Sequence, residues 1–173
     1  MALAALGAAL AALPAAAMTP GQAACPAQLA PKTLGPLLTQ EMMNFKEGQA
    51  QNPAITAGVK QVLDACIKRE KIKPDQEDAY TKYVIARVSH DDLALQLTGL
   101  KVPTAVLDKA FGLGLGLANP ASDQITEVQF AEAISELNKA GVDIDKLPAN
   151  AMQMMGAYVA VTGEMYRAMA LVG

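Results

Sequence analysis

The chain has 173 residues, of which 52% are hydrophobic and 4% aromatic, and a formal net charge of −3. Its 14 Lys and Arg residues form no basic stripe, which argues against a nucleic-acid partner, and the chain has no Trp to stack on bases or sugars. About 150 residues remain after the N-terminal segment discussed next, which suits one domain with a core of its own.

The N-terminal segment is a short, uncharged, apolar run. Residues 2–13 contain only Ala, Leu and Gly, and Pro14 and three alanines follow. A secretory signal combines such a run with a small-residue cleavage site, whereas a stable membrane span needs about 20 apolar residues. We predict a secretory signal peptide over residues 1–17, cleaved before Met18 or alternatively before Ala24, and a periplasmic or secreted protein without a stable membrane span. No basic residue precedes the run, and the competing interpretation is a buried Ala-rich helix.

The two cysteines of the chain are expected to pair. Cys25 falls in a Pro- and Ala-rich stretch, residues 18–33, that we expect to be irregular. Cys66 falls on the apolar face of a predicted helix, with Ile55, Val59 and Val62. Exported proteins keep disulfides, and no C-x-x-C redox motif is present. We predict a Cys25–Cys66 disulfide; the alternative is one buried and one exposed thiol.

Helical periodicity, with Pro, Gly and Asn at the breaks, continues to the end of the chain. A Ser89–Asp92 capping pattern predicts a break within residues 74–99. The expected helices cover residues 35–47, 53–71, 74–88, 89–99, 103–117, 126–141 and 147–171. The predicted fold, residues 34–173, is an all-α, single-domain helical bundle of about six or seven helices with a buried apolar C-terminal helix.

Glycines suggest how the C-terminal helix packs. Gly156 and Gly163 lie on a stripe of small residues, and the alternating glycines of residues 112–116 fall inside another predicted helix. Each glycine destabilises a helix by roughly 1 kcal/mol relative to Ala. Several glycines in one helix are therefore expected only where close packing against another helix compensates for this loss. We predict that the two helices cross at the centre of the bundle, and that Gly156→Leu is strongly destabilising.

Candidate catalytic and metal-binding patterns are weak. His90 is the only histidine, and its neighbours Ser89, Asp91 and Asp92 cannot converge as a triad because adjacent side chains point in different directions. Asp143 and Asp145 have calcium-loop spacing, but the following positions lack the Gly and closing Glu. We interpret both patterns as helix caps. The sequence therefore predicts no catalytic residue, no metal site and no cofactor.

Nine methionines offer soft ligands, and Met152 and Met155 share a helix face. Thioethers bind Cu(I), although Met165 starts about 15 Å further along the helix, which favours packing or an apolar pocket over a copper site. Tyr158 is on the same helix.

The same helix also carries two charged residues. Glu164 and Arg167 are spaced to pair with each other. These two and Met152, Met155 and Tyr158 are the predicted ligand-binding residues.

We expect an exported, non-enzymatic protein that binds an apolar ligand or a protein partner in a Met- and Gly-lined groove beside the last helix. One alternative is an enzyme that uses Glu164 and Arg167, or His90, as its acid–base group. The second is Met-based Cu(I) handling.

Overall fold

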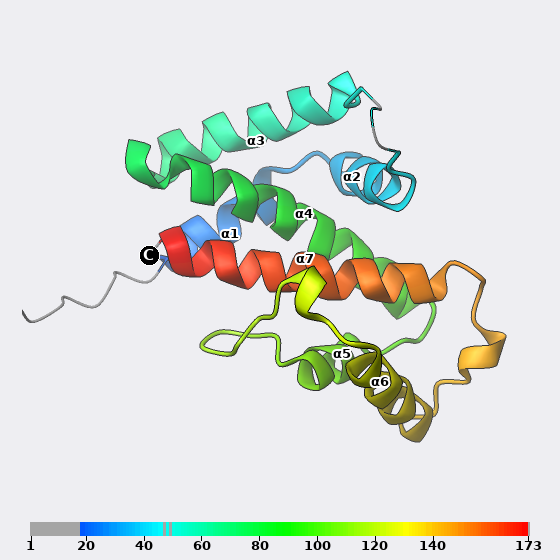
Figure 1. The fold of residues 1–173 in the computed structure, drawn as a ribbon. Helices are drawn as coiled ribbons and strands as arrows, with labels where there is room; N and C mark the ends of the chain where they lie inside the picture. Colours follow the sequence, from blue (N-terminus) through cyan, green and yellow to red (C-terminus); the bar gives the residue numbers. More distant parts are fainter. Residues whose placement is uncertain (1–17, 47, 49, 173) are drawn as a thin grey trace, which may run out of the picture.

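The computed structural model describes residues 18–46, 48 and 50–172, so the predicted signal peptide lies outside the described residues. The described part is helical, without a strand (Figure 1). Its α-helices are α1 (Pro20–Leu29), α2 (Leu34–Met43), α3 (Pro53–Glu70), α4 (Glu77–Gly99), α5 (Thr104–Phe111), α6 (Glu127–Lys139) and α7 (Ala151–Val172). Three short 3₁₀ helices accompany them: η1 (Pro74–Gln76), η2 (Ser122–Gln124) and η3 (Ile144–Lys146). The predicted all-α, single-domain bundle is confirmed.

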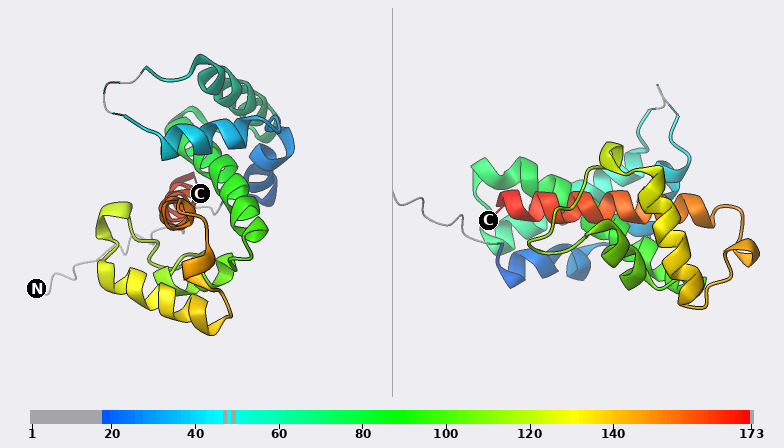
Figure 2. Two further views of the ribbon diagram at one scale, coloured as in Figure 1. Left: turned by 90° about the vertical axis from the view of Figure 1, so that its right-hand side faces the viewer. Right: turned by 60° about the horizontal axis from the view of Figure 1, so that its bottom comes forward.

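Helix α7 occupies the centre of the molecule, paired with α4. Seen along its axis in Figure 2, it lies between the α1–α3 side of the molecule and the α5–α6 side. The N-terminal half of α4 and the C-terminal half of α7 share one apolar cluster with α1, α2 and α3. The opposite halves share a second cluster with α5 and α6. The α4–α7 pair is therefore antiparallel, and its middle is the seam between two cores.

The prediction of an irregular segment over residues 18–33 is wrong for residues 20–29, which form α1. Thr19 and Gln22 make a capping box, and Pro20 stands at the first helical turn, where its fixed φ suits the helix. Residues 31–33 remain outside the helices.

An internal proline, Pro26, is accommodated in α1 by a tyrosine from α4. Pro26 has no N–H, so it cannot donate to the carbonyl of Gln22 one helical turn earlier. The Tyr80 hydroxyl supplies that bond, at 2.9 Å from the Gln22 oxygen. Next to it, the Tyr83 hydroxyl donates to the Ala23 oxygen at 2.7 Å. Helix α1 is thus completed by tertiary contacts with α4.

The predicted disulfide is confirmed. Cys25 in α1 and Cys66 in α3 are bonded, with their Cα atoms 5.8 Å apart. Both cysteines are fully buried. The bond ties α1 to α3 at the start of the described chain.

The predicted break within residues 74–99 is wrong, since α4 runs unbroken from Glu77 to Gly99. Ser89, expected to cap a new helix, is instead buried at the seam between the two cores. Packing on both sides of α4 outweighs the local capping preference. His90 therefore lies in a helix and not on a turn.

The predicted glycine crossing is also wrong. Helix α5 ends at Phe111, and Gly112, Gly114 and Gly116 adopt positive φ values in a loop that runs along α7 toward its C-terminal end (Figures 1 and 2). A Cβ at Gly156 would lie 3.7 Å from the Phe130 ring of α6, an ordinary contact. The helix that packs most extensively on α7 is α4.

The start of the last helix also differs from the prediction. A 3₁₀ turn and a short connection follow Val142, and α7 begins at Ala151. None of the described helices is both long enough and apolar enough to cross a membrane.

Candidate functional site

A groove opens beside the last helix, at the seam between the two cores. We call it the α2–α4–α7 groove. Its volume is about 660 Å³. It is lined by Leu38, Glu41, Met42, Phe45, Gln51, Ile55, Lys82, Ile85, Ala86, Ser89, Ser122, Ala160, Val161, Glu164 and Arg167. Most of these side chains are apolar, and charged ones from α2, α4 and α7 share the lining.

Two of the predicted ligand-binding residues, Glu164 and Arg167, line this groove. Their side chains pair as expected from their spacing, with 2.7 Å between Arg167 Nη2 and Glu164 Oε2. Arg167 Nη1 also donates to the Asn119 carbonyl oxygen at 2.7 Å. The guanidinium is therefore held by a carboxylate of its own helix and by the loop that follows α5.

The structure places the other three predicted ligand-binding residues outside the groove. Met155 and Tyr158 are buried in the core shared with α5 and α6, while Met152 is partly exposed at the start of α7. Met42 of α2 is the methionine that lines the groove. Met42 and Phe45 fall within the helix expected over residues 35–47, but the sequence gives no sign that this segment meets α7.

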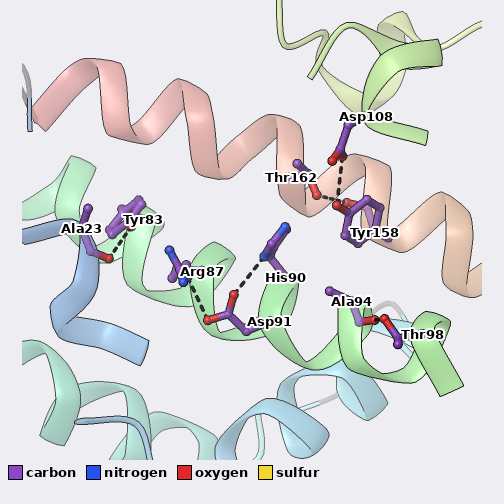
Figure 3. Close-up of polar contacts among 10 residues, drawn as sticks. All are labelled: Ala23, Tyr83, Arg87, His90, Asp91, Ala94, Thr98, Asp108, Tyr158 and Thr162. Carbon is purple, nitrogen blue, oxygen red and sulfur yellow. Dashed lines mark hydrogen bonds and ion pairs between the residues drawn. The ribbon is translucent and has the colours of Figure 1, made fainter. Parts of the chain in front are cut away.

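A polar cluster lies on α4 next to the seam (Figure 3). Arg87 Nε donates to Asp91 Oδ2 at 2.8 Å, and His90 Nδ1 is 3.0 Å from Asp91 Oδ1. Burial of Asp91 acts to raise its pKa, but the hydrogen bonds to His90 and Arg87 outweigh it and hold the pKa below its usual value. Asp91 is thus kept ionised by two partners.

Tyr158 connects this cluster to α5. The His90 and Tyr158 rings have centroids 5.2 Å apart, and the Tyr158 hydroxyl donates to Asp108 Oδ1 at 2.9 Å. Burial and the neighbouring Asp108 carboxylate raise the pKa of Tyr158. Burial raises the pKa of Asp108, although the Tyr158 hydrogen bond and the charge of His90 act in the opposite direction. Three helices therefore bring His90, Asp91, Asp108 and Tyr158 together.

The two carboxylates predict opposite pH effects on stability. Because its pKa is raised, Asp108 stabilises the fold most at low pH. This contribution is lost as the pH rises above 3.8, the ordinary pKa of an aspartate side chain. A lowered pKa means that Asp91 stabilises the fold at neutral pH, and that this contribution is lost as pH falls below 3.8. We expect Asp108→Asn, which keeps an oxygen for Tyr158, to be more stable than the wild type at about pH 7 and equal to it at about pH 3.

Urea unfolding of both single variants at the two pH values checks this. Asp91→Asn is the matched control, and we expect it to be less stable than the wild type at about pH 7 because it removes the carboxylate that Arg87 and His90 bind. If the stabilities of the two variants, each relative to the wild type, changed in the same direction between the two pH values, the opposite pKa shifts of Asp108 and Asp91 would be contradicted.

The described residues contain no group of three or more His, Cys, Asp and Glu side chains placed to hold a metal ion. Met155 and Met165, considered as copper ligands, lie in different apolar clusters. His90, Asp108 and Tyr158 do not line the α2–α4–α7 groove. In the described part, the groove and the polar cluster are therefore separate features.

The geometry is the basis for a functional assignment, because no close relative supplies one. Comparison with models of protein families, with curated proteins and with solved structures finds no match.

Proposed function

We propose that the chain is an exported helical protein that holds a small apolar molecule in the α2–α4–α7 groove. The observation that carries the proposal is the groove itself. Its volume of about 660 Å³ falls in the range of small-molecule sites, roughly 300–1,000 Å³. Its apolar lining with a few polar groups has the composition typical of such sites.

The side chains of the groove suggest the chemistry of the bound molecule. Phe45 is 70% exposed and Ile85 is 37% exposed, so a bound molecule would remove apolar surface from water. Lys82 and the Glu164–Arg167 pair line the same groove and offer partners to a polar end. The expected ligand therefore has an apolar body and one polar group.

Two observations support export. The disulfide between α1 and α3 suits an oxidising compartment, and the apolar run of residues 2–13 has the composition of a signal. The structure favours cleavage before Met18 over cleavage before Ala24. Cleavage before Ala24 would cut α1 and remove the Gln22 and Ala23 carbonyls that Tyr80 and Tyr83 bind.

Filling the groove tests the proposal. Ala160 lines the groove on α7, so we expect Ala160→Phe to occupy part of it. With the fluorescent probe 1-anilinonaphthalene-8-sulfonate, which has an aromatic body and one sulfonate, we predict that this variant binds about tenfold more weakly than the wild type, or about 1.4 kcal/mol. Fluorescence titration gives the two dissociation constants.

Ala131→Phe is the matched control, because Ala131 is an exposed residue of α6 and the chemical change is the same. We expect it to bind the probe as the wild type does, and circular dichroism should give the same helix content for both variants and the wild type. Equal probe affinity in Ala160→Phe and the wild type would overturn the proposal, as would an equal loss in Ala131→Phe.

An enzyme is the second candidate, and the polar cluster is the observation that favours it. His90 lies against Asp91 and Tyr158 with its side chain 20% exposed, so a titratable network does converge there. An acid–base role needs a substrate within hydrogen-bond reach of the imidazole. Binding of a small molecule in the α2–α4–α7 groove does not require a reacting group beside the imidazole, which is why it is the preferred proposal.

A further inference from the structure

A small polar pocket lies where α2 meets the C-terminal end of α4 and the start of α7. We call it the amide pocket. Its volume is about 280 Å³. Five of its lining residues have carboxamide side chains: Gln40, Asn44, Gln96, Asn150 and Gln153. The described residues that line it include no charged side chain, and none of them lines the α2–α4–α7 groove.

Three of these carboxamides are fixed to the protein through their nitrogen atoms. Gln153 Nε2 donates to the Met43 carbonyl oxygen at 2.8 Å, which joins α7 to α2. Gln96 Nε2 donates to Asp92 at 2.6 Å, and Asn44 Nδ2 donates at 2.9 Å to the backbone carbonyl four residues before it. Among the described residues, no protein group donates to the oxygen atoms of these three side chains. Each one therefore retains an acceptor oxygen and a second N–H for a bound molecule.

Thr39 adds a hydroxyl group that makes no hydrogen bond. The residue lines the amide pocket and is 4% exposed, and its Oγ1 is buried without a partner among the described residues. A buried hydroxyl without a hydrogen bond is unfavourable, and the large majority of buried polar groups in native proteins have a partner. A bound molecule with polar groups of its own would supply the partner that Thr39 lacks.

The rest of the amide pocket is apolar and consists of Pro36, Met43 and Met154. A sugar ring has the matching distribution of groups, because hydroxyls project from its edge and C–H bonds cover its faces. Each hydroxyl both donates and accepts, as each carboxamide does. An ion would find no opposite charge in this lining, and a wholly apolar molecule would leave the carboxamides unpaired. The composition of the pocket therefore favours an uncharged sugar.

We propose that the amide pocket binds one neutral hexose. Its volume is slightly below the roughly 300–1,000 Å³ of drug-sized sites, which suits a single ring and not a longer chain. The carboxamides bond the hydroxyl groups of the sugar. Because the chain has no Trp, the contact with the ring face is made by Pro36, Met43 and Met154. The site is independent of the ligand proposed for the α2–α4–α7 groove.

Nuclear magnetic resonance tests this directly, because the side-chain NH2 groups of Asn and Gln give signals of their own in ¹H–¹⁵N correlation spectra. The ¹⁵N-labelled protein is titrated separately with glucose, galactose and mannose. We expect at least one hexose to shift the NH2 signals of the amide pocket in a saturable manner. The NH2 signal of Gln61 should not shift, since Gln61 is exposed on α3 and does not line the pocket.

Leucine variants then locate the site. Gln40→Leu combined with Gln96→Leu removes two carboxamides from exposed helix positions, and we expect it to weaken hexose binding about tenfold or more. Gln61→Leu is the matched control and should bind as the wild type does. Ala160→Phe, which fills the α2–α4–α7 groove, should also bind the hexose with unchanged affinity. Circular dichroism should give the same helix content for all of these proteins.

Thr39→Val separates a binding role from a structural one. It removes the unpartnered hydroxyl, so we expect the free variant to be at least as stable as the wild type in urea unfolding. We also expect it to bind the hexose about threefold more weakly, which a merely structural threonine would not do.

Four results would overturn the proposal: no shift of the NH2 signals of the amide pocket with any of the three hexoses, an equal shift of the Gln61 signal, unchanged affinity in the double leucine variant or in Thr39→Val, or loss of binding in Ala160→Phe. An equally strong response to N-methylacetamide would also overturn it, because the pocket would then recognise amides in general.

Discussion

Replacing both cysteines, Cys25→Ala with Cys66→Ala, is expected to lower the free energy of unfolding by about 4 kcal/mol. The bond joins residues 41 apart in sequence, and its loss allows the unfolded chain many more conformations. The folded state keeps the apolar contacts of α1 and the bonds from Tyr80 and Tyr83. We therefore expect a less stable protein with the same helices.

Urea unfolding followed by circular dichroism measures this change. The matched control is the wild type with and without dithiothreitol, because reduction removes the bond without changing the sequence. The reduced wild type should unfold close to the double variant. A decrease below about 1 kcal/mol in the double variant would contradict the stabilising role of the bond.

Gly163→Ala is expected to destabilise the protein by about 1–3 kcal/mol. A Cβ at this position would lie 2.8 Å from the carbonyl oxygen of Pro120 and 3.2 Å from Arg167 Nη1. The carbonyl belongs to the backbone and cannot turn aside, so the segment after the loop must move away from α7. That movement also weakens the bond between Arg167 and Asn119.

Gly156→Ala is the matched control on the same helix. Its Cβ would meet only an ordinary contact with Phe130, at 3.7 Å, so the higher helix propensity of Ala should stabilise the protein by about 0.5–1 kcal/mol. Urea unfolding of the two variants should therefore give changes of opposite sign. A loss of stability in both, or in Gly156→Ala alone, would show that the packing around α7 differs from the structure.

The features predicted well from the sequence are those with local causes. Helices α3 and α6 begin within one residue of the expected starts at 53 and 126, where Asn52 caps α3 and a capping box of Thr126 and Gln129 starts α6. The Glu164–Arg167 pair follows from its spacing on one helix. Helix α1 could have been found in the same way, because Thr19, Pro20 and Gln22 are a recognisable start signal.

The features that were missed depend on contacts between distant parts of the chain. Ser89 looks like a cap in isolation, yet it is buried where the two cores meet, and α4 continues through it. The glycines of residues 112–116 fit a thin helix surface equally well. Gly112 instead ends α5 in a left-handed conformation, and the Asn119 side chain bonds the backbone of Gly114 across the loop. The α2–α4–α7 groove needs α2 to meet α7, which no local pattern indicates.

Native mass spectrometry of the protein exported from cells that express the full chain tests the central proposal most directly. The proposal predicts a mature chain that begins at Met18, has the mass of the disulfide form and carries a small molecule, which the Ala160→Phe variant loses and Ala131→Phe retains. A wild-type protein without a bound molecule, or equal occupancy in Ala160→Phe, would contradict a ligand in the α2–α4–α7 groove.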